Sequence, residues 1–319
     1  MKLAPGAPGA RILGVGDYRP VRVMPNSELE AMVDTNDQWI RERTGIVSRR
    51  IAAPDETVVD MGAAAGAKAL AAAGLTPADV DLVLVATSSH ADRMPGAAPL
   101  IASRLGIPSP GALDVNAACA GFPYAVAQAS DAIRSGNARR VLVIGAEKMS
   151  ALVDWTDRGT CILFADGAGA VVVGPSDEPG IGPVVWGSDG ERGDLITCLG
   201  TDPFLRMAGP AVFRWATTSL APVVREACAR AGVEVADLKV IVFHQANARI
   251  IDAVVRALGL AEDVVVARDV VESGNTSAAS IPMALARVLE SGEVESGSLA
   301  LLLGFGSGLN YAGQVVALP

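Results

Sequence analysis

Two stretches of this 319-residue sequence repeat one another at an almost constant distance along the chain. Residues 68–85 combine an Ala-rich helical pattern, a turn at Gly74 and an apolar strand pattern. Residues 225–243 combine the same patterns around Gly232, 158 positions after Gly74. A sequence of this kind predicts a fold that contains two copies of one helix–turn–strand unit.

A second pair of segments supports the repeat. Residues 116–123 begin with Asn and end with Pro, and residues 275–282 do the same 159 positions later. Each segment leads into an apolar helical pattern, a Ser-Gly turn and a strand that ends in glycine, at Gly145 and Gly304. Chance similarity between Ala-rich helices would explain one such pair, but several pairs in the same order favour duplication.

Strand and helix patterns alternate through both copies, which is typical of an α/β fold with mixed or parallel sheets. We predict two pseudo-symmetric halves, residues 1–174 and 175–319, with the carboxyl ends of their strands facing a shared site. Residues 187–209 break the pattern with Asp-Gly, Arg-Gly and Asp-Pro pairs. We interpret them as an excursion between the halves, where loops often carry function.

Composition excludes several classes of protein. Half of the residues are hydrophobic and 19% are charged, so the chain is not disordered. The apolar runs, such as residues 141–144 and 299–303, are too short to span a membrane. Residues 1–10 lack the apolar core of a signal peptide, so we expect a cytoplasmic protein. A net charge of −9 argues against non-specific binding to nucleic acid.

Four cysteines lie far apart in the sequence, and there are only two histidines, so we predict neither a metal ion nor a disulfide framework. Cys119 differs from the others because Pro123 indicates that the next helix begins near residues 119–122. The amides and the positive dipole end of a helix N-terminus favour a thiolate, and hence a nucleophile. A buried, inert cysteine is the alternative interpretation.

Two further polar residues lie next to apolar segments. His244 ends the strand pattern of residues 240–243, and Asn275 lies in a Ser-Gly-Asn-Thr-Ser loop before a helix. Taken alone, the histidine fits a structural residue and the asparagine fits a helix N-cap. The repeat, however, puts Asn275 and Cys119 on equivalent loops, which a pseudo-twofold axis would bring together.

A glycine-rich segment, Gly304-Phe-Gly-Ser-Gly308, follows an apolar strand pattern. It fits a tight turn, and its spacing is not that of a phosphate-binding Walker loop. Because glycines let backbone amides approach a substrate closely, the segment is also a candidate donor of hydrogen bonds to a developing oxyanion.

Together these motifs resemble those of β-ketoacyl-acyl-carrier-protein synthase III, the initiating condensing enzyme of type II fatty acid synthesis. The resemblance runs from Ile12 to Gly313 and is greatest to actinobacterial members, including relatives in polyketide pathways. It implies a thiolase-like fold, in which two α/β halves with central mixed sheets stack as αβαβα layers. The motifs that carry it are Asn116–Phe122, Asp157–Thr160, Phe164–Ala170, Phe243–Ile250 and Ser273–Ser277.

The resemblance implies a catalytic triad of Cys119, His244 and Asn275. Cys119 would attack an acyl-CoA thioester and hold the acyl group. The backbone amides of Cys119 and Ser307 would form the oxyanion hole, with serine in place of the glycine often found there. Malonyl-acyl carrier protein would then lose carbon dioxide. Hydrogen bonds from a neutral His244 and from Asn275 would stabilise the enolate that attacks the acyl group.

Substrate-binding residues follow from the same resemblance. Trp39 and Arg43 match the segment that contacts the adenine of coenzyme A, with Arg158 on the other side. An indole and a guanidinium can sandwich a purine. Gly209 and Asn247 match positions near the pantetheine arm. No permanently bound cofactor is implied, because acyl-CoA and the phosphopantetheine of the carrier protein are substrates.

Contacts with partners are implied as well. Arg214, Arg249 and Arg256 match the basic patch that docks the acidic carrier protein, and the chain is expected to form a homodimer. Met94 lies in the region that shapes the acyl pocket across the dimer. The charged Arg93 beside it leaves the starter acyl group open.

The sequence also leaves other activities open. An acyltransferase of the same fold would keep Cys119 and His244 and move the acyl group to an alcohol, an amine or another carrier without loss of carbon dioxide. Asn275 favours condensation, because acyl transfer needs no second enolate donor. A non-catalytic partner of a larger synthase fits less well, as does a thiolase, which needs a second cysteine near the site. Residues 189–207 look shorter than in typical members, which leaves their effect on substrate choice open.

Overall fold

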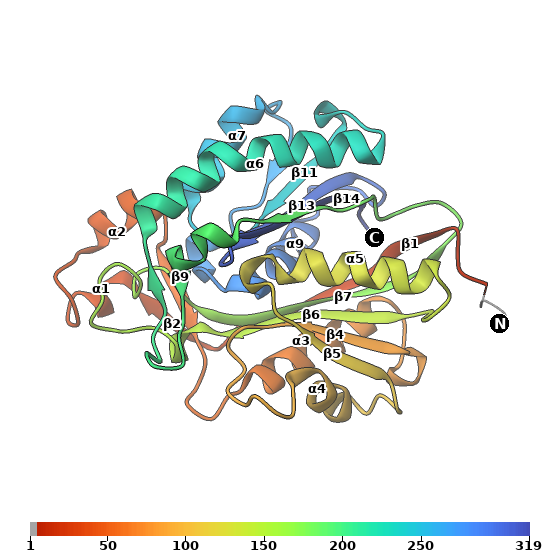
Figure 1. Ribbon diagram of the computed structural model, residues 1–319, viewed down its shortest axis with the longest axis horizontal. Helices are drawn as coiled ribbons and strands as arrows, with labels where there is room; N and C mark the ends of the chain where they lie inside the picture. The colour runs from red at the N-terminus through yellow and green to blue at the C-terminus, as the bar shows by residue number, and fades with distance from the viewer. Residues whose placement is uncertain (1–4) are drawn as a thin grey trace.

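Two five-stranded mixed sheets form the centre of the computed structural model, which describes residues 5–319 (Figure 1). The N-terminal segment in which no signal peptide is expected therefore lies partly outside the described residues. The first sheet has the order β1 (Gly9–Tyr18), β7 (Asp166–Ser176), β6 (Val141–Lys148), β4 (Leu82–Ala86), β5 (Gly111–Val115). The second has the order β8 (Val185–Ser188), β14 (Asn310–Ala317), β13 (Leu299–Gly306), β11 (Val240–Phe243), β12 (Val265–Val266).

The two sheets share one topology, which confirms the predicted duplication. In each sheet the first three strands in this order pair antiparallel, and the remaining pairs are parallel. Strand β6 thus corresponds to β13 and strand β4 to β11. The central strands are buried on both faces, which explains why their sequences read as continuous apolar runs.

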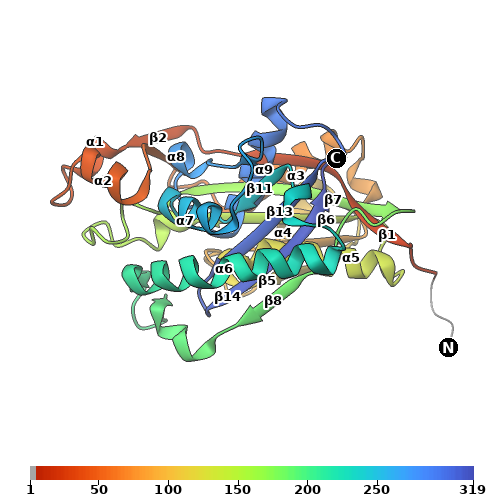
Figure 2. The same ribbon diagram turned by 90° about the horizontal axis from the view of Figure 1, so that it is seen from above.

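Helices cover the sheets in layers, and Figure 1 shows the resulting αβαβα stack from the side. Helices α3 (Val58–Ala72) and α4 (Ala97–Leu105) pack on the outer face of the first sheet. Helices α6 (Gly209–Ala231) and α7 (Ala248–Leu258) pack on the outer face of the second. Figure 2 looks down on the stack, with α6 and α7 in front of the strands that they cover. Helices α5 (Gly121–Arg134) and α9 (Ser280–Ser291) lie between the sheets and share one apolar core with both. This is the layered arrangement predicted from the sequence. Within residues 5–319, no helix has the length and hydropathy needed to cross a bilayer.

The pseudo-equivalent glycines of β6 and β13 each face a loop of the other half. A Cβ added at Gly145 would overlap the carbonyl oxygen of Ala278. A Cβ added at Gly304 would lie 2.8 Å from the Cα of Ala120. The absence of a side chain at these two positions lets the loops that precede α5 and α9 meet at the centre of the molecule.

Those two loops also have the same unusual backbone conformation. Ala118 has a φ of 46° and Ser277 a φ of 49°, both in the left-handed region that non-glycine residues rarely adopt. The two residues are 159 positions apart, as the sequence repeat predicts. Such strain, which costs on the order of 1–3 kcal/mol per residue, is commonly found at functional sites.

The remaining elements extend to the side of the stack that carries the site. Strands β2 (Arg22–Pro25) and β3 (Ser48–Ile51) form a two-stranded ribbon. Helices α1 (Asn26–Leu29) and α2 (Asp37–Thr44) lie between these strands in the sequence, and α8 (Val270–Ser273) packs against β3. The excursion predicted at residues 187–209 begins within β8. It then forms a hairpin of β9 (Ile196–Thr197) and β10 (Arg206–Met207) and ends at the first residue of α6.

Candidate active site

A cavity of about 650 Å³ lies where the two halves meet, on the side that carries α2 and the β9–β10 hairpin. Most of the residues predicted to be functional line it. They are Trp39, Arg43, Cys119, Gly209, Arg214, His244, Asn247, Arg249, Asn275 and Ser307. Three predicted residues do not line it, namely Met94, Arg158 and Arg256. Both halves therefore contribute to a single site.

Cys119 lies in a short 3-10 helix (Ala118–Ala120) between β5 and α5, immediately before the first turn of α5. Its Sγ accepts a hydrogen bond from the hydroxyl of Ser277, 3.4 Å away, which comes from the opposite half. The backbone of Gly306 lies against the residue, since a Cβ there would be 2.9 Å from Sγ. The amide of Ser307, the predicted second oxyanion donor, follows directly in the chain.

The sulfur is a neutral thiol in the free protein. Burial raises the pKa of Cys119 from its ordinary value near 9 to about 12, and the nearby Glu147 carboxyl acts in the same direction. The expectation that the helix end favours a thiolate is therefore wrong for the free protein. Desolvation by the surrounding chain outweighs the stabilising hydrogen bonds.

His244 follows β11 and is almost completely buried. Its Nδ1 lies 2.7 Å from the Oγ of Ser280, and this hydroxyl oxygen also accepts a hydrogen bond from the amide of Gln245. In the tautomer in which the serine hydroxyl donates to Nδ1, the hydrogen of the imidazole is on Nε2. The ring packs edge-on against Phe305, with 5.2 Å between the ring centroids.

Burial lowers the pKa of His244 from 6.5 to about 3. The imidazole is therefore neutral at physiological pH, which is the state that a hydrogen-bond donor to a substrate carbonyl requires. An imidazole with so low a pKa is a weak base, and it does not hold a proton taken from the thiol.

Asn275 is held by its backbone and by its side-chain oxygen. The residue forms a parallel bridge with Phe164, and its Oδ1 accepts a hydrogen bond of 2.9 Å from the amide of Ser277. Because the oxygen is used in this way, the NH2 group is the part of the carboxamide available to a ligand in the cavity. The side chains of His244 and Asn275 thus present donors on the wall that also carries Cys119.

The rim of the cavity carries a cluster of one indole and two guanidinium groups. The guanidinium carbon of Arg158 lies 4.8 Å from the ring centroid of Trp39, and that of Arg43 lies 5.6 Å from it. Arg158 also donates a hydrogen bond of 2.8 Å to the carbonyl of Asp34. Since Arg158 lies directly over the indole, a purine could enter between them only after they separate.

The residues predicted to contact the pantetheine arm lie at helix starts. Gly209 is the first residue of α6, and Asn247 caps α7 with its Oδ1, which accepts a hydrogen bond of 3.0 Å from the amide of Ile250. Both residues line the cavity, and the NH2 group of Asn247 is not used by the cap.

The three predicted docking arginines lie on α6 and α7. Arg214 and Arg249 are exposed and line the cavity, and the guanidinium of Arg249 lies 5.3 Å from the ring centroid of Phe213. Arg256 is exposed in the last turn of α7 and lies away from the cavity.

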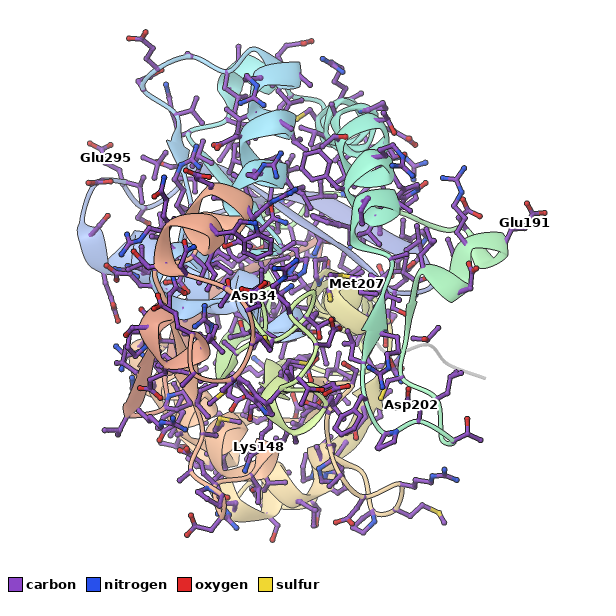
Figure 3. The ribbon with its side chains drawn as sticks, turned by 90° about the vertical axis from the view of Figure 1, so that its left-hand side faces the viewer. Asp34, Lys148, Glu191, Asp202, Met207 and Glu295 are labelled. Carbon is purple, nitrogen blue, oxygen red and sulfur yellow. The ribbon has the colours of Figure 1, made fainter. Side chains whose placement is uncertain are left out.

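The β9–β10 hairpin forms one wall of the cavity (Figure 3). In that view Met207 lies at the base of the hairpin and Asp202 near the tip of the hairpin. Arg206 ties the hairpin to the body of the protein through Asp154, at 2.8 Å, and also pairs with Asp202 within the hairpin, at 2.7 Å. Met94, in contrast, is 87% exposed and does not contact the cavity of its own chain.

Sequence reasoning missed one ionisable group at the site. Glu147 is completely buried near the carboxyl end of β6, and it interacts electrostatically with Cys119. A charged residue that ends an otherwise apolar strand pattern, Val141-Leu-Val-Ile-Gly-Ala-Glu147, was a signal that could have identified it. Ser277 and Ser280 carried no comparable signal, because their partners lie far away in the sequence.

The sequence and the fold match known proteins along nearly the whole chain. Residues 113–190 match the family model of 3-oxoacyl-[acyl-carrier-protein (ACP)] synthase III, and residues 228–318 match its C-terminal family model. A β-ketoacyl-[acyl-carrier-protein] synthase III of Streptomyces coelicolor is 57% identical over 98% of this chain and 99% of its own length. The β-ketoacyl-[acyl-carrier-protein] synthase III of Streptomyces glaucescens is 51% identical over 100% of this chain and 99% of its own length.

Comparison with solved structures agrees with these sequence matches. The priming β-ketosynthase of the R1128 polyketide biosynthetic pathway superposes with a TM-score of 0.97 at 47% identity, covering 100% of this chain and 98% of the other. The 3-oxoacyl-[acyl-carrier-protein] synthase III of Aquifex aeolicus superposes with a TM-score of 0.93 at 41% identity, and the match covers 97% of this chain and 100% of the other.

Proposed function

The chain belongs to the 3-oxoacyl-[acyl-carrier-protein] synthase III family, and from this premise we propose how it carries out its reaction. As a member of this family it is a condensing transferase that initiates fatty acid or polyketide synthesis. The proposal is a two-step reaction through an acyl-cysteine at Cys119, followed by decarboxylative Claisen condensation. The observation that carries it is the convergence of Cys119, His244 and Asn275, from both halves, on one cavity.

In the first step the sulfur of Cys119 attacks the thioester carbonyl of an acyl-CoA, and the carbon–sulfur bond to coenzyme A breaks. The backbone amides of Cys119 and Ser307 stabilise the oxyanion of the tetrahedral intermediate. The close approach of Gly306 to Sγ supports this assignment, because it brings the following amide near the reacting carbon.

In the second step malonyl-acyl carrier protein occupies the cavity and loses carbon dioxide. Its thioester carbonyl accepts hydrogen bonds from Nε2 of His244 and from the NH2 group of Asn275, which stabilise the enolate. The neutral state of His244 and the fixed carboxamide of Asn275 support these roles. The carbanion attacks the acyl group on Cys119, and the β-ketoacyl product leaves on the carrier protein.

Substrates are proposed to enter past the Trp39 cluster. Trp39 and Arg43 hold the adenine of acyl-CoA, with Arg158 on the other side once it has moved away from the indole. Gly209 and Asn247 contact the pantetheine arm. Acyl-CoA and the phosphopantetheine arm are substrates in this scheme, so the reaction needs no resident cofactor.

The acidic carrier protein is proposed to dock on Arg214, Arg249 and Arg256. All three are exposed, and Arg214 and Arg249 line the cavity, whereas Arg256 lies farther along α7. These exposed positive charges support the assignment on a chain of net charge −9. A cytoplasmic location fits these substrates.

A homodimer is part of the proposal. Strand β5 is an edge of the first sheet, and Leu113 on it is 45% exposed. An exposed edge with an apolar side chain is a surface that proteins commonly cover. In a dimer formed there, the exposed Met94 would reach the acyl pocket of the partner subunit and influence which starter is accepted.

The decisive experiment measures the intact mass of the protein after incubation with a panel of acyl-CoAs. We expect the mass of one acyl group to be added, peptide mapping to locate it on Cys119, and Cys119→Ala to remain unloaded. The added mass identifies the starter. Loading of Cys119→Ala, or an acyl group mapped to another residue, would contradict the assignment.

The alternative is an acyltransferase of the same fold that moves the acyl group to an alcohol, an amine or another carrier. Malonyl carrier protein labelled with ¹³C at the free carboxyl separates the two, because only condensation releases labelled carbon dioxide together with a β-ketoacyl product. Asn275→Ala should still load Cys119 but lose condensation by about 100-fold or more, since one oxyanion donor is removed. Equal loss of both steps would argue against the donor role.

A further inference from the structure

Glu147 is a buried acid that the proposed reaction does not use. Its carboxyl accepts hydrogen bonds from the amide and the hydroxyl of Ser88, at 3.1 and 3.0 Å. The hydroxyls of Thr87, at 3.3 Å, and of Ser89 also donate to it, and the amide of Ala278 approaches to 3.5 Å. The donors can stabilise a carboxylate, although the residue is completely buried.

A hydroxyl connects this carboxyl to the reacting sulfur. Ser277 donates a hydrogen bond to Sγ of Cys119 at 3.4 Å, and the amide of the next residue, Ala278, lies 3.5 Å from the Glu147 carboxyl. Hydrogen bonding with the Ser277 side chain lowers the pKa of Glu147. A serine hydroxyl can accept a proton from one neighbour while it gives its own to the other. Cys119, Ser277 and Glu147 therefore form a chain along which a proton can pass in either direction.

The charged side chains near Glu147, namely those of Lys148 and Asp166, form their hydrogen bonds with other groups. Burial raises its pKa, and the hydrogen bonds described above oppose this shift. The neighbouring ammonium of Lys148 points to the carbonyls of Ala53, Pro54 and Glu56 rather than to Glu147. On strand β7, the carboxyl of Asp166 is engaged by Ser150 and by the amide of Ala52.

Cys119 is the ionisable group that is coupled to Glu147. A carboxylate at Glu147 disfavours a thiolate at Cys119, so the two groups do not carry negative charges at the same time. When the sulfur is acylated, its proton has to leave. His244 is too weakly basic to keep it.

Resting on the proposed acylation of Cys119, we propose that Glu147 stores the thiol proton between the two half-reactions. As Sγ bonds to the acyl carbon, the thiol proton passes to Ser277 and the serine proton passes to the Glu147 carboxylate. Coenzyme A leaves as a thiolate and takes a proton from water. In condensation the bond between the acyl carbon and Sγ breaks with its electron pair on sulfur. The stored proton then returns through Ser277, which restores the thiol and the carboxylate.

Infrared difference spectroscopy tests this on the whole protein. Spectra of the acylated minus the free protein are recorded in H2O and D2O, with acetyl-CoA or, if it does not load, the acyl-CoA of the panel that does. We expect carboxylate bands to disappear and a protonated carboxyl band to appear that shifts in D2O. The thioester carbonyl absorbs in the same region, but its band does not shift. Loading on Cys119 is verified by mass in the same sample.

Three variants assign the signal. Glu147→Gln should lack the protonated carboxyl band. Ser277→Ala interrupts the chain and should slow acylation by about 100-fold, the lower range of general acid–base effects. Alanine suits this position, because Ala118 has the same conformation at the equivalent site. Thr87→Val is the matched control. It removes one donor to Glu147 but leaves the chain to Cys119 intact, so it should keep the band and load within a few-fold of the parent.

The outcomes separate this proposal from the proposed function. Without an acyl group on Cys119, the proposed function itself fails. If Cys119 is acylated but no D2O-sensitive carboxyl band appears, only the proton store is overturned. A band already present before acylation, or one that persists in Glu147→Gln, overturns it as well. The parent spectrum alone suffices if a variant does not fold.

Discussion

The thiol of Cys119 and the imidazole of His244 are both neutral in the free protein, for the same physical reason. Burial disfavours each charged form, which raises the pKa of the thiol to about 12 and lowers that of the imidazole to about 3. A thiolate–imidazolium pair is therefore not the resting state. In the proposed reaction the sulfur has to lose its proton during attack, which is why a nearby proton acceptor matters.

The reactivity of Cys119 toward iodoacetamide should rise with pH without reaching a plateau. With a pKa of about 12, about one thiol in ten thousand is ionised at pH 8, and this fraction grows tenfold per pH unit. Alkylation can be followed by peptide mass spectrometry between pH 6 and 10, with the exposed Cys198 as a reference in the same sample. A plateau with a midpoint near pH 7 would mean that the helix end does stabilise the thiolate.

Ser280→Ala should impair condensation more than acyl loading. Without the serine hydroxyl, Nδ1 of His244 loses its partner at 2.7 Å, and the tautomer that carries the proton on Nε2 is no longer selected. We expect a loss of about tenfold or more in the malonyl-dependent step, measured by single turnover of the pre-acylated enzyme. Mass-detected loading of Cys119 should change little. Equal loss in both steps would point to a structural role instead.

That Cys119, His244 and Asn275 line one cavity could be predicted from sequence, because the repeat relates the loops of Cys119 and Asn275 and the family resemblance adds His244. Their charge states could not, since desolvation depends on packing against the other half. Ser277 lies 158 positions after Cys119 in the sequence, and a local sequence pattern cannot show that their side chains are in contact. Glu147 did carry a local signal, a charge at the end of an apolar strand pattern, but its closeness to Cys119 depends on the fold.

Among the elements, the two central loops depend on the glycines opposite them. The carboxyl end of β6 has room for the loop before α9 only because Gly145 has no side chain, and β13 accommodates the loop before α5 in the same way at Gly304. The site is therefore assembled by strands of one half supporting the nucleophile or donor loop of the other.

Gly145→Ala should lower the free energy of unfolding by about 1–3 kcal/mol, the usual range for overpacking a core, because its Cβ would overlap the backbone of Ala278. The midpoint of urea unfolding measures this. Gly190→Ala is the control, because a Cβ there meets no atom within 4 Å, and we expect a change within about 0.5 kcal/mol. Equal stability of the two variants would show that the loop can shift without cost.

Long periodic elements were predictable, and short ones were not. The patterns of residues 68–85 and 225–243 gave the ends of α3 and α6 and the strands that follow them, because apolar side chains must alternate with the period of their element. Strands β9 and β10 are two residues long, too short for any period. From the sequence, the segment that contains them could be identified only as a break in the alternating strand and helix patterns.

At the scale of the whole molecule, ion pairs hold the halves in the register that the shared site needs. Arg19, in the first half, lies 2.8 Å from the buried Asp269 of the second and donates to the carbonyl of Met283 at 3.1 Å. Its Nε lies 2.7 Å from Asp17. Separating the halves would remove Arg19 from the buried Asp269 and leave that carboxylate with Arg287 alone, at 3.0 Å, which is unfavourable for a buried charge.

The edge of the first sheet at β5 is a part of the molecular surface that a partner could cover. Strand β5 pairs with β4 on one side only, so its other backbone groups face outward together with the 45% exposed Leu113. Pairing with the β5 of a second copy would satisfy those groups and bury the leucine. It would also bring the exposed Met94 of each subunit toward the other.

Leu113→Lys should therefore shift the protein from the proposed dimer to a monomer, because it would place a charged side chain from each subunit in the apolar interface. Light scattering during size exclusion measures the change in mass from twice the chain mass to once. We expect activity to fall with dissociation and to recover at high protein concentration, since the partner's contribution to the acyl pocket is restored by mass action. Val21→Lys, at an 89% exposed apolar residue between β1 and β2, is the control and should stay dimeric. A Leu113→Lys variant that remains a dimer would place the interface elsewhere.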